Sequence, residues 1–164
     1  MRFTIERRAL VKMVERLKGE RLRDERGRVL RDEGELAPVF QTMLENATRI
    51  CEARFGSMLL RDGDAFRRVA MHNAPTAFVE FNERVRLVRP ENAPGVARLV
   101  KTKQPIHVAD MAAEEPDDPI VKFAGARTLL VVPMLKEDEL LGAIGIYRQE
   151  VRPFSDKQIE LVAN

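Results

Sequence analysis

Two apolar segments joined by a short charged turn constrain the fold more than any other feature of the chain. The first segment, residues 128–135 (TLLVVPML), is apolar at nearly every position, so it does not alternate as a strand with one solvent-facing side would. Four charged residues follow at 136–139 (KEDE), and a second apolar segment returns over 140–147 (LLGAIGIY). We therefore predict a central antiparallel hairpin that is buried on both faces.

Three residues of this hairpin carry further information. Pro133 cannot donate a backbone hydrogen bond, so it predicts either an unpaired position or a kink in the first strand. Gly142 and Gly145 leave the returning strand without side chains at two positions, which allows a helix or a ligand to approach its backbone.

The composition limits the chain to one domain plus an extension, because 164 residues with 45% hydrophobic residues suffice for one well-buried core. No apolar run approaches the roughly 20 residues that span a bilayer. The Arg-rich start also lacks the apolar core of a secretory signal. A single cysteine, Cys51, excludes an internal disulfide and fits a reducing compartment. We predict a soluble, cytoplasmic protein without a membrane partner.

We divide the chain into an N-terminal helical extension or linker, residues 1–35, and a domain, residues 36–164. The extension carries 11 Lys+Arg against 8 Asp+Glu and no interleaved aromatic residues, so a nucleic-acid partner is not expected. Residues 9–17 (ALVKMVERL) predict an amphipathic helix with an apolar stripe of Leu10, Met13, Val14 and Leu17. Residues 20–35 are charged and interrupted by two glycines, which is typical of a linker.

The domain begins with a helix over residues 36–55, followed by a hairpin. Periodic apolar positions predict one buried helix face, made of Leu36, Phe40, Met43, Ala47, Ile50 and Cys51. Strands over 57–60 and 66–71 flank the turn signal Asp62-Gly63. Short helices are expected over 75–81 and 94–101, with a loop between them, and a strand is expected over 105–109.

The remaining elements are defined by helix-capping signals. An acidic loop, residues 110–118, ends at Asp118, which is placed to cap a short helix that starts at Pro119 and ends at Gly125. After the central hairpin, Ser155 and Gln158 form a capping box, with Phe154 and Ile159 as its hydrophobic staple. This last helix reaches Asn164 after barely three turns, so we expect that it continues in a longer chain or that the sequence is a fragment.

This order of elements resembles a GAF domain of bacterial sensor histidine kinases and related signalling proteins. The resemblance covers residues 36–164, and its most specific parts are ATRICEARFGSMLLRDGDAFRRVAMHN, TKQPIHVAD and GARTLLVVPMLKEDELLGAIGIYRQEVRPFSDKQIELVAN. It implies an α+β fold: an antiparallel sheet of five or six strands with the long first and last helices on one face. The other face carries short helices and loops over a ligand pocket. The lead-in is shorter and more glycine-broken than the long signalling helix that often precedes such domains.

The resemblance also selects candidate ligand-binding residues from the segments on the pocket side. They are Met71, Asn73, Phe78, Phe81, Val96, Val100, His107, Phe123, Thr128, Leu130 and Val132. We expect a mostly apolar pocket with a few polar groups and an unidentified small-molecule ligand. No cofactor is predicted.

Candidate catalytic and metal-binding residues are few. Cys51 shares the apolar stripe of the first helix, so a buried core thiol is the preferred interpretation over a redox residue, and no second thiol exists to resolve it. His72 and His107 lie near strand ends, where a haem ligand, a polar ligand contact or a partly exposed histidine are all possible. The acidic loop lacks the spacing of a calcium site. We predict no catalytic residue set and no metal site.

Two functional hypotheses follow from these features. The preferred one is a non-enzymatic sensory or regulatory domain that binds a small ligand or a partner and relays a helix movement in bacterial signal transduction, for example to a kinase or cyclase output module of a two-component system. The alternative is a small redox-active enzyme or thiol sensor of GAF fold that acts through Cys51. Thiol labelling of the native protein separates the two.

We also predict a homodimer formed through the helices. The apolar stripe of residues 9–17 needs a partner to stay ordered in water. Val39 and Leu44 of the first helix, together with the exposed side of the last helix, are the other apolar candidates for the contact.

Overall fold

In the computed structural model, the two apolar segments form the predicted central hairpin, β5 (Thr128–Lys136) and β6 (Glu139–Arg148). β5 is buried from Thr128 to Met134, and β6 is buried at every position after its first, which confirms that both faces of the hairpin are covered. The turn is shorter than the four charged residues predicted, because Lys136 pairs with Glu139. Glu137 makes this possible by adopting a left-handed backbone conformation with a φ of 54°.

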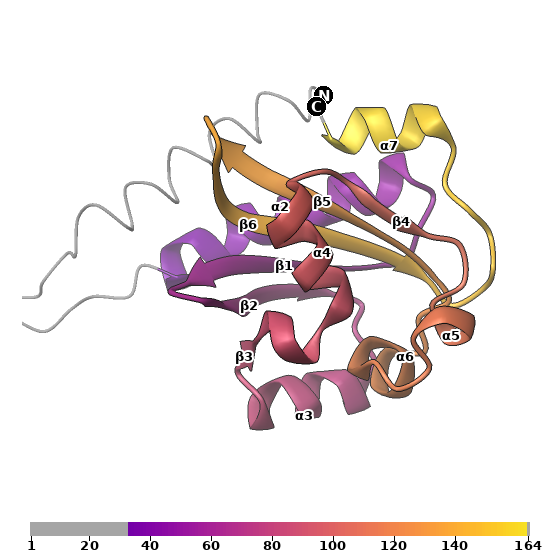
Figure 1. The fold of residues 1–164 in the computed structure, drawn as a ribbon, viewed down its shortest axis with the longest axis horizontal. Helices are drawn as coiled ribbons and strands as arrows, with labels where there is room; N and C mark the ends of the chain where they lie inside the picture. Colours follow the sequence, from indigo (N-terminus) through magenta and orange to yellow (C-terminus); the bar gives the residue numbers. More distant parts are fainter. Residues whose placement is uncertain (1–32, 164) are drawn as a thin grey trace, which may run out of the picture.

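The structure describes residues 33–163, so the amphipathic helix predicted over 9–17 lies outside the described residues. The described part contains one six-stranded antiparallel sheet in the order β3-β2-β1-β6-β5-β4 (Figure 1). The strands outside the central hairpin are β1 (Phe55–Asp62), β2 (Ala65–His72), β3 (Leu87–Val88) and β4 (Ile106–Val108). The α+β class and the strand number agree with the expectation from the sequence.

Pro133 lies within β5, opposite Ala143 of β6. β4 pairs with β5 only from Leu129 to Val131, so it no longer runs alongside β5 at the proline. A shift in register between Met134 and Leu135 follows directly. A strand edge and a bulge are the two settings in which a sheet tolerates proline, since neither requires its missing N–H.

The first and last helices of the described residues, α2 (Glu33–Ile50) and α7 (Asp156–Ala163), cover one face of the sheet. The predicted buried stripe of α2 is confirmed, since Phe40, Met43, Ala47 and Cys51 are all buried in this layer. The capping box that opens α7 is also present, with the Ser155 N–H donating to Gln158 Oε1 and the Gln158 N–H donating to Ser155 Oγ.

One of the two apolar residues of α2 that the sequence left for a partner is buried within the domain itself. Leu44 is 0% exposed, whereas Val39 is partly buried against the same core. The expectation that Leu44 remains free is wrong, because α2 contacts β1, β2, β6 and α7 and therefore buries a wider arc than one stripe.

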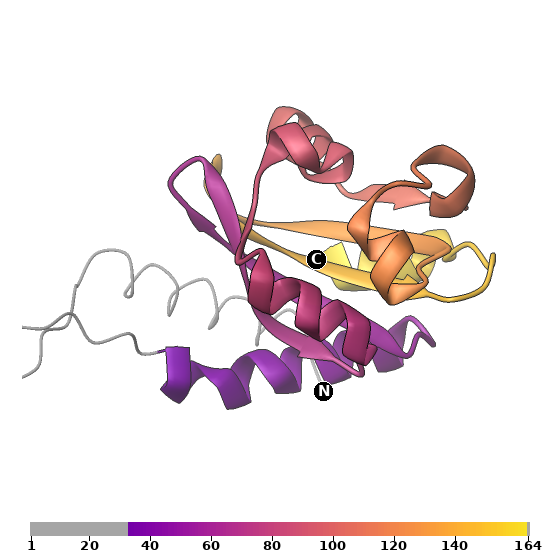
Figure 2. The ribbon, with the colours of Figure 1, turned by 90° about the horizontal axis from the view of Figure 1, so that it is seen from below.

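The opposite face is covered by short helices (Figure 2). They are α3 (Thr76–Arg84), the 3-10 helix η1 (Pro90–Asn92), α4 (Pro94–Thr102), α5 (Met111–Glu114) and α6 (Pro119–Ala124). Figure 2 shows α2 and α4 on opposite sides of the strands. The predicted cap of α6 is confirmed, because Asp118 Oδ1 accepts from the Ile120 N–H at 2.9 Å and Gly125 ends the helix with a φ of 69°.

Three short elements, β3, η1 and α5, lie where the sequence predicted only loops. β3 is two residues long and pairs with Phe66 and Arg67 of β2. α5 is a single turn within the acidic loop, capped by Asp110, whose carboxylate accepts from the Ala112 N–H and also forms a bidentate ion pair with Arg127 at 2.8 and 2.9 Å. Elements this short have no periodicity that a sequence pattern can reveal.

Among the helices of residues 33–163, none is both long enough and apolar enough to cross a membrane.

Candidate functional site

A mostly apolar cavity of about 240 Å³ lies between the sheet and the short helices. Its floor comes from the central strands, its walls from α3, α4 and α6, and its rim from residues 85–95, which include β3 and η1. The lining residues are Ser57, Leu59, Arg68, Phe78, Phe81, Val85, Leu87, Val88, Arg89, Asn92, Ala93, Gly95, Val96, Met111, Asp118, Pro119, Ile120, Leu129, Val131 and Gly145. Sites for small ligands usually combine apolar walls with a few polar groups in this way.

The floor of this cavity follows from the alternation of side chains along the strands. Leu59, Leu129 and Val131 face the cavity side, whereas their neighbours Met58, Leu130 and Val132 face the α2 and α7 layer. Gly145 lies opposite Ser57 and Val131 and leaves its position on the floor open. A Cβ atom there would meet only Ser57, at 3.6 Å from Oγ, which is ordinary contact.

Three of the eleven residues selected from the sequence line the cavity, namely Phe78, Phe81 and Val96. Met71, Val100 and Phe123 pack against the same apolar core without reaching the lining. Phe123 stacks on Phe81 with 4.9 Å between ring centroids, so it packs against a lining residue without lining the cavity itself.

Asn73 lies apart from the cavity lining. Its side-chain amide donates to the Arg54 carbonyl at 3.0 Å, and its φ of 56° places it in a turn after β2. This contact fixes the end of the hairpin between β1 and β2, so the assignment of Asn73 to the pocket side is a misplacement.

The other four candidates, His107, Thr128, Leu130 and Val132, lie on the wrong face. Leu130 and Val132 belong to the core under α2 and α7, and Leu129 and Val131 line the cavity instead. A shift of one residue inverts every side chain of a strand. Because β5 is apolar on both sides, its sequence has no polar alternation that could set the choice.

His107 and Thr128 hold the segment that leads into α7. His107 Nε2 accepts from the Phe154 N–H at 3.1 Å, which requires a neutral ring at that nitrogen. Burial, followed by the charge of Arg148, lowers the pKa of His107 and favours this neutral form. Thr128 Oγ1 donates to the Ala109 carbonyl and accepts from the Arg152 N–H.

Arg68, Arg89 and Asp118 are the charged residues of the lining, and none of them is among the ligand-binding residues predicted from the sequence. The guanidinium carbon of Arg68 lies 4.6 Å from the centroid of the Phe78 ring, and Arg68 Nη1 donates to Asn82 Oδ1 at 3.4 Å. Burial lowers the pKa of Arg68 to about 10, so it stays charged at neutral pH. Burial raises the pKa of Asp118, while the N–H of Ile120 and the charge of Arg68 oppose that shift. The available signal was the pair of arginines within the strand predicted over 66–71.

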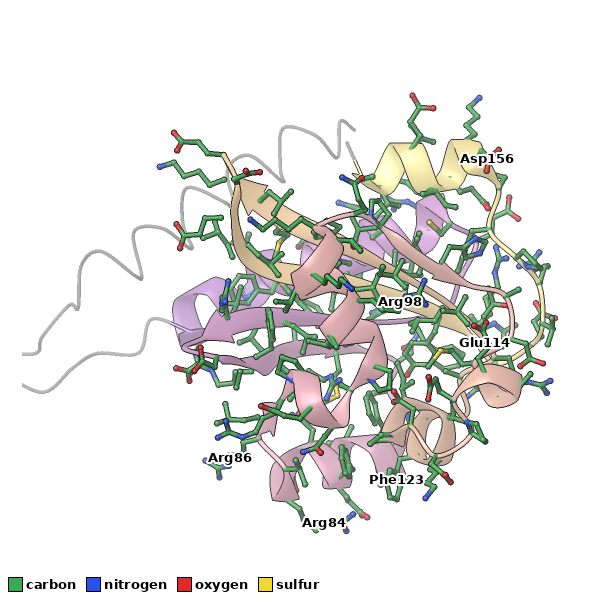
Figure 3. All side chains as sticks on the ribbon, in the orientation of Figure 1. Arg84, Arg86, Arg98, Glu114, Phe123 and Asp156 are labelled. Carbon is green, nitrogen blue, oxygen red and sulfur yellow. The ribbon has the colours of Figure 1, made fainter. Side chains whose placement is uncertain are left out.

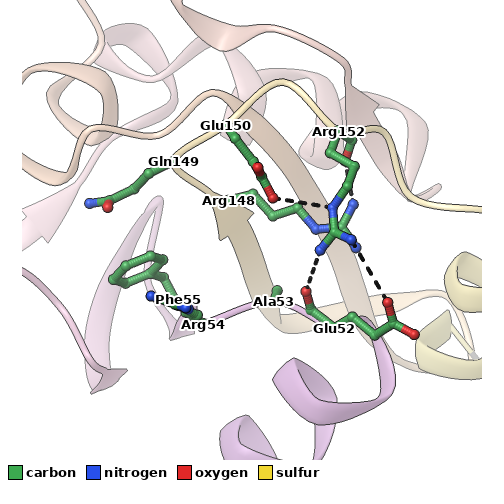
Figure 4. A pocket seen from close by; sticks show the side chains of 8 residues that line it. All are labelled: Glu52, Ala53, Arg54, Phe55, Arg148, Gln149, Glu150 and Arg152. Atoms are coloured by element: carbon green, nitrogen blue, oxygen red, sulfur yellow. Dashed lines mark hydrogen bonds and ion pairs between the residues drawn. The ribbon is translucent and has the colours of Figure 1, made fainter.

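A second, larger cavity of about 380 Å³ lies at the end of the sheet near the start of β1 (Figure 4). It is lined by Glu52, Ala53, Arg54, Phe55, Arg148, Gln149, Glu150 and Arg152. Arg152 forms ion pairs with Glu150 at 3.2 Å and with Glu52 at 3.8 Å, so its charge is already matched. Most lining residues of this larger cavity are charged or polar, whereas the walls of the smaller cavity are mostly apolar, so the smaller cavity is the better candidate for a small-ligand site.

Chemistry based on Cys51 finds little support in its surroundings. The thiol is buried, as predicted, and burial raises its pKa to about 12. A thiol of this kind is protonated at neutral pH and unreactive. Within residues 33–163, no three His, Cys, Asp or Glu side chains are grouped so that they could hold a metal ion.

Comparison with known proteins places this geometry in one family. A sequence model of the GAF domain matches residues 34–164. No curated protein sequence matches the chain significantly.

Several solved structures share the fold. A GAF domain/HD domain protein from Geobacter sulfurreducens has 19% identity and a TM-score of 0.64, with 80% of this chain and 88% of that chain covered. A domain of a protein described as a two-component sensor histidine kinase from Sinorhizobium meliloti 1021 has 21% identity and a TM-score of 0.60, covering 77% of this chain and 81% of that chain. An NreA protein from Staphylococcus aureus, mutated in its nitrate binding site, has 10% identity and a TM-score of 0.57, covering 76% and 91%.

Proposed function

The chain belongs to the GAF domain family, and on that basis we propose that it is a non-enzymatic sensory or regulatory domain whose cavity beneath α3 and α4 binds a small ligand. The observation that carries this proposal is the cavity of about 240 Å³ itself, with apolar walls and three charged residues, Arg68, Arg89 and Asp118. Its volume is below the roughly 300–1,000 Å³ that is common for ligand pockets, which favours a compact ligand.

Strand β5 of the central hairpin contacts both the cavity and the core under α2 and α7. Leu129 and Val131 line the cavity, while Leu130 and Val132, their neighbours on the same strand, pack in the core under α2 and α7. A ligand that displaces β5 therefore moves both layers. We propose that binding is relayed as a movement of α2 relative to α7.

Arg148 strengthens this route at the end of β6. Its Nη2 donates to the Cys51 carbonyl, just after α2 ends, at 2.5 Å. Its Nη1 donates to the carbonyls of Arg152 and Pro153, which precede α7. One side chain thus connects the end of α2 to the start of α7.

The partners of the relay remain those expected from the sequence, namely a kinase or cyclase output module and a second copy of the chain. A domain of similar fold in a protein described as a sensor histidine kinase supports the first partner. For the dimer, Leu161 of α7 is 48% exposed, whereas Leu44 is buried and Val39 is partly buried in the core under α2 and α7. We therefore assign the contact to α7 and to the apolar stripe predicted within residues 9–17.

The alternative, an enzyme or thiol sensor that uses Cys51, is disfavoured by the burial and the raised pKa of that thiol. Labelling with a maleimide separates the two hypotheses. The sensory proposal expects Cys51 to react only after denaturation, whereas the alternative requires rapid reaction in the native protein.

Filling the cavity tests the proposed ligand binding. A leucine at Gly145 makes only ordinary contact at Cβ and extends into the cavity, while Gly145→Ala leaves most of the space open and serves as the matched control. We expect native mass spectrometry of protein purified from its own host to detect a bound small molecule in the wild type and in Gly145→Ala, but not in Gly145→Leu. The proposal fails if no small molecule accompanies the wild type, or if Gly145→Leu retains the same one.

The relay is tested separately by hydrogen exchange. We expect the amides of α2 and α7 to change their exchange rates when the bound molecule is removed from the wild type. Unchanged rates in both helices, together with changed rates around the cavity, would show that binding is not transmitted.

A further inference from the structure

Arg68 faces the cavity because it pairs with Leu59 of β1, in a register that runs unbroken from the turn between β1 and β2. Met58 pairs with Ala70, but the next residue, Leu59, pairs with Arg68, so Val69 is an extra residue that forms a bulge directly after Arg68. Arg68 lines the cavity, whereas Val69 and Ala70 pack against the core under α2.

The guanidinium of Arg68 has donors that the described residues leave unused. Its Nε is fully buried and has no hydrogen-bond partner in residues 33–163. Nη1 has one long hydrogen bond, of 3.4 Å, to Asn82. No carboxylate of the described residues forms an ion pair with Arg68, and the face of the guanidinium rests on Phe78 instead. Buried N–H groups, and buried charges above all, are normally paired.

Asp118 does not satisfy this arginine. One of its oxygens, Oδ1, accepts from the Ile120 N–H and caps α6. The two charges face the same cavity but remain apart, so an open space beside Arg68 is available to another negative group.

The charged residues of the rim and lining are basic in excess. The rim, residues 85–95, contains Arg86 and Arg89 against Glu91. Arg89 also lines the cavity, together with Arg68 and Asp118. Figure 3 shows Arg84 and Arg86 at the α3 and β3 end and Arg98 on α4. The lining therefore has one positive charge in excess, which favours a ligand of the opposite sign.

The remaining lining residues are apolar, so they match a ligand that has an apolar part. Phe78 and Phe81 form an aromatic wall, and Val96, Ile120 and Val131 complete the apolar surround. An inorganic anion would leave these surfaces in contact with water, whereas an organic acid would cover them.

From these observations we infer that the ligand of this cavity is a small organic anion, a compact monocarboxylate, whose charged group is bound by the Nη groups of Arg68 and whose apolar part packs against Phe78, Phe81 and Val96. This inference rests on the proposed function, since it names the ligand class of the same cavity. A carboxylate is the group that fits the planar, two-donor edge of a guanidinium.

The test is a ligand panel measured by isothermal titration calorimetry on the full chain at low salt. The panel contains butanoate, hexanoate, benzoate and phenylacetate, each with its primary amide, plus butylamine and benzylamine. We expect at least one carboxylate to bind at least about tenfold more tightly than its amide, because the amide leaves the buried charge unmatched. The amines should not bind.

Variants of Arg68 assign the effect to one residue. Arg68→Met should weaken carboxylate binding by at least about tenfold, and Arg68→Lys should give an intermediate loss because a lysine lacks the planar fork. The control Arg67→Met changes the next residue of β2, on the other side of the sheet, and should retain binding. Urea unfolding should show Arg68→Met to be as stable as the wild type, since the change removes a buried charge without an ion pair.

Each other outcome is decisive. Amides or amines that bind as tightly as carboxylates, or Arg68→Met with undiminished binding, would overturn the inference and leave the proposed function standing. If no panel member binds, the molecule that accompanies the wild type decides, since an organic acid supports the inference and a neutral or cationic molecule overturns it. If no small molecule accompanies the wild type and no member of the panel binds, the proposed function fails, and the inference fails with it.

Discussion

Replacing Arg148 tests whether a single buried side chain connects α2 and α7. Arg148 is 5% exposed at the end of β6. Its guanidinium donates to the Cys51 carbonyl at 2.5 Å and to the Pro153 carbonyl at 3.3 Å, and lies 4.2 Å from the centroid of the Phe154 ring. Arg148→Ala would remove all these contacts at once and leave the Cys51 carbonyl buried without a partner.

The expected loss follows from these contacts. A buried hydrogen bond from a charged donor contributes about 1.5–3 kcal/mol. The stacking on Phe154 adds about 0.5–2 kcal/mol. Because the remaining contacts are only partly buried, we expect Arg148→Ala to lower the free energy of unfolding by about 3 kcal/mol. Arg148→Lys should lose less, since an ammonium can reach some of these carbonyls but not all of them at once.

Arg152→Ala is the matched control, because Arg152 lies four residues further along in the same segment. Its side chain is 51% exposed and forms ion pairs with Glu52 and Glu150. Exposed ion pairs contribute about 0–1 kcal/mol, so this variant should lose less than about 1 kcal/mol. Urea unfolding followed by circular dichroism measures both losses. Equal losses in the two variants would refute the special role assigned to Arg148.

Four further predictions test other parts of the fold. Gly142→Ala should lower the free energy of unfolding by about 1–3 kcal/mol, because the new Cβ would lie 2.2 Å from a carbonyl oxygen of β1. Gly145→Ala should be neutral or slightly stabilising. Urea unfolding measures both variants, and equal stabilities would contradict this prediction. The lowered pKa of His107 means that the unfolded state binds the proton more tightly than the folded state. The free energy of unfolding should therefore fall as the pH drops from about 6.5 toward the folded-state pKa. His107→Gln should lack this dependence of stability on pH, which unfolding curves at several pH values measure. The Tyr147 hydroxyl is buried without a hydrogen-bond partner in residues 33–163, so Tyr147→Phe should leave the free energy of unfolding unchanged or raise it by up to about 1 kcal/mol; a clear loss would reveal a partner. Cys51→Ser should lower stability by about 1–3 kcal/mol without abolishing ligand binding, and unchanged stability with lost binding would contradict the role of Cys51 as a core residue.

The amino-acid sequence alone determined the elements with strong local signals. The apolar segments of the central hairpin, the periodic stripe of α2, and the caps provided by Asp118 and Ser155 are encoded by neighbouring residues, and the structure confirms them. Their physical basis is local, because periodicity and capping depend on residues within one or two turns of each other.

The tertiary structure decided which side of each strand faces the cavity. β5 is apolar on both sides, so nothing in its sequence distinguishes Leu130 from Leu129, and three of the proposed ligand residues, Thr128, Leu130 and Val132, face α2 and α7 instead of the cavity for this reason. Arg68 faces the cavity because it pairs with Leu59, and this register exists only in the pairing of β2 with β1. The charge that we assign to ligand recognition therefore depends on a register between two strands, which no single strand encodes.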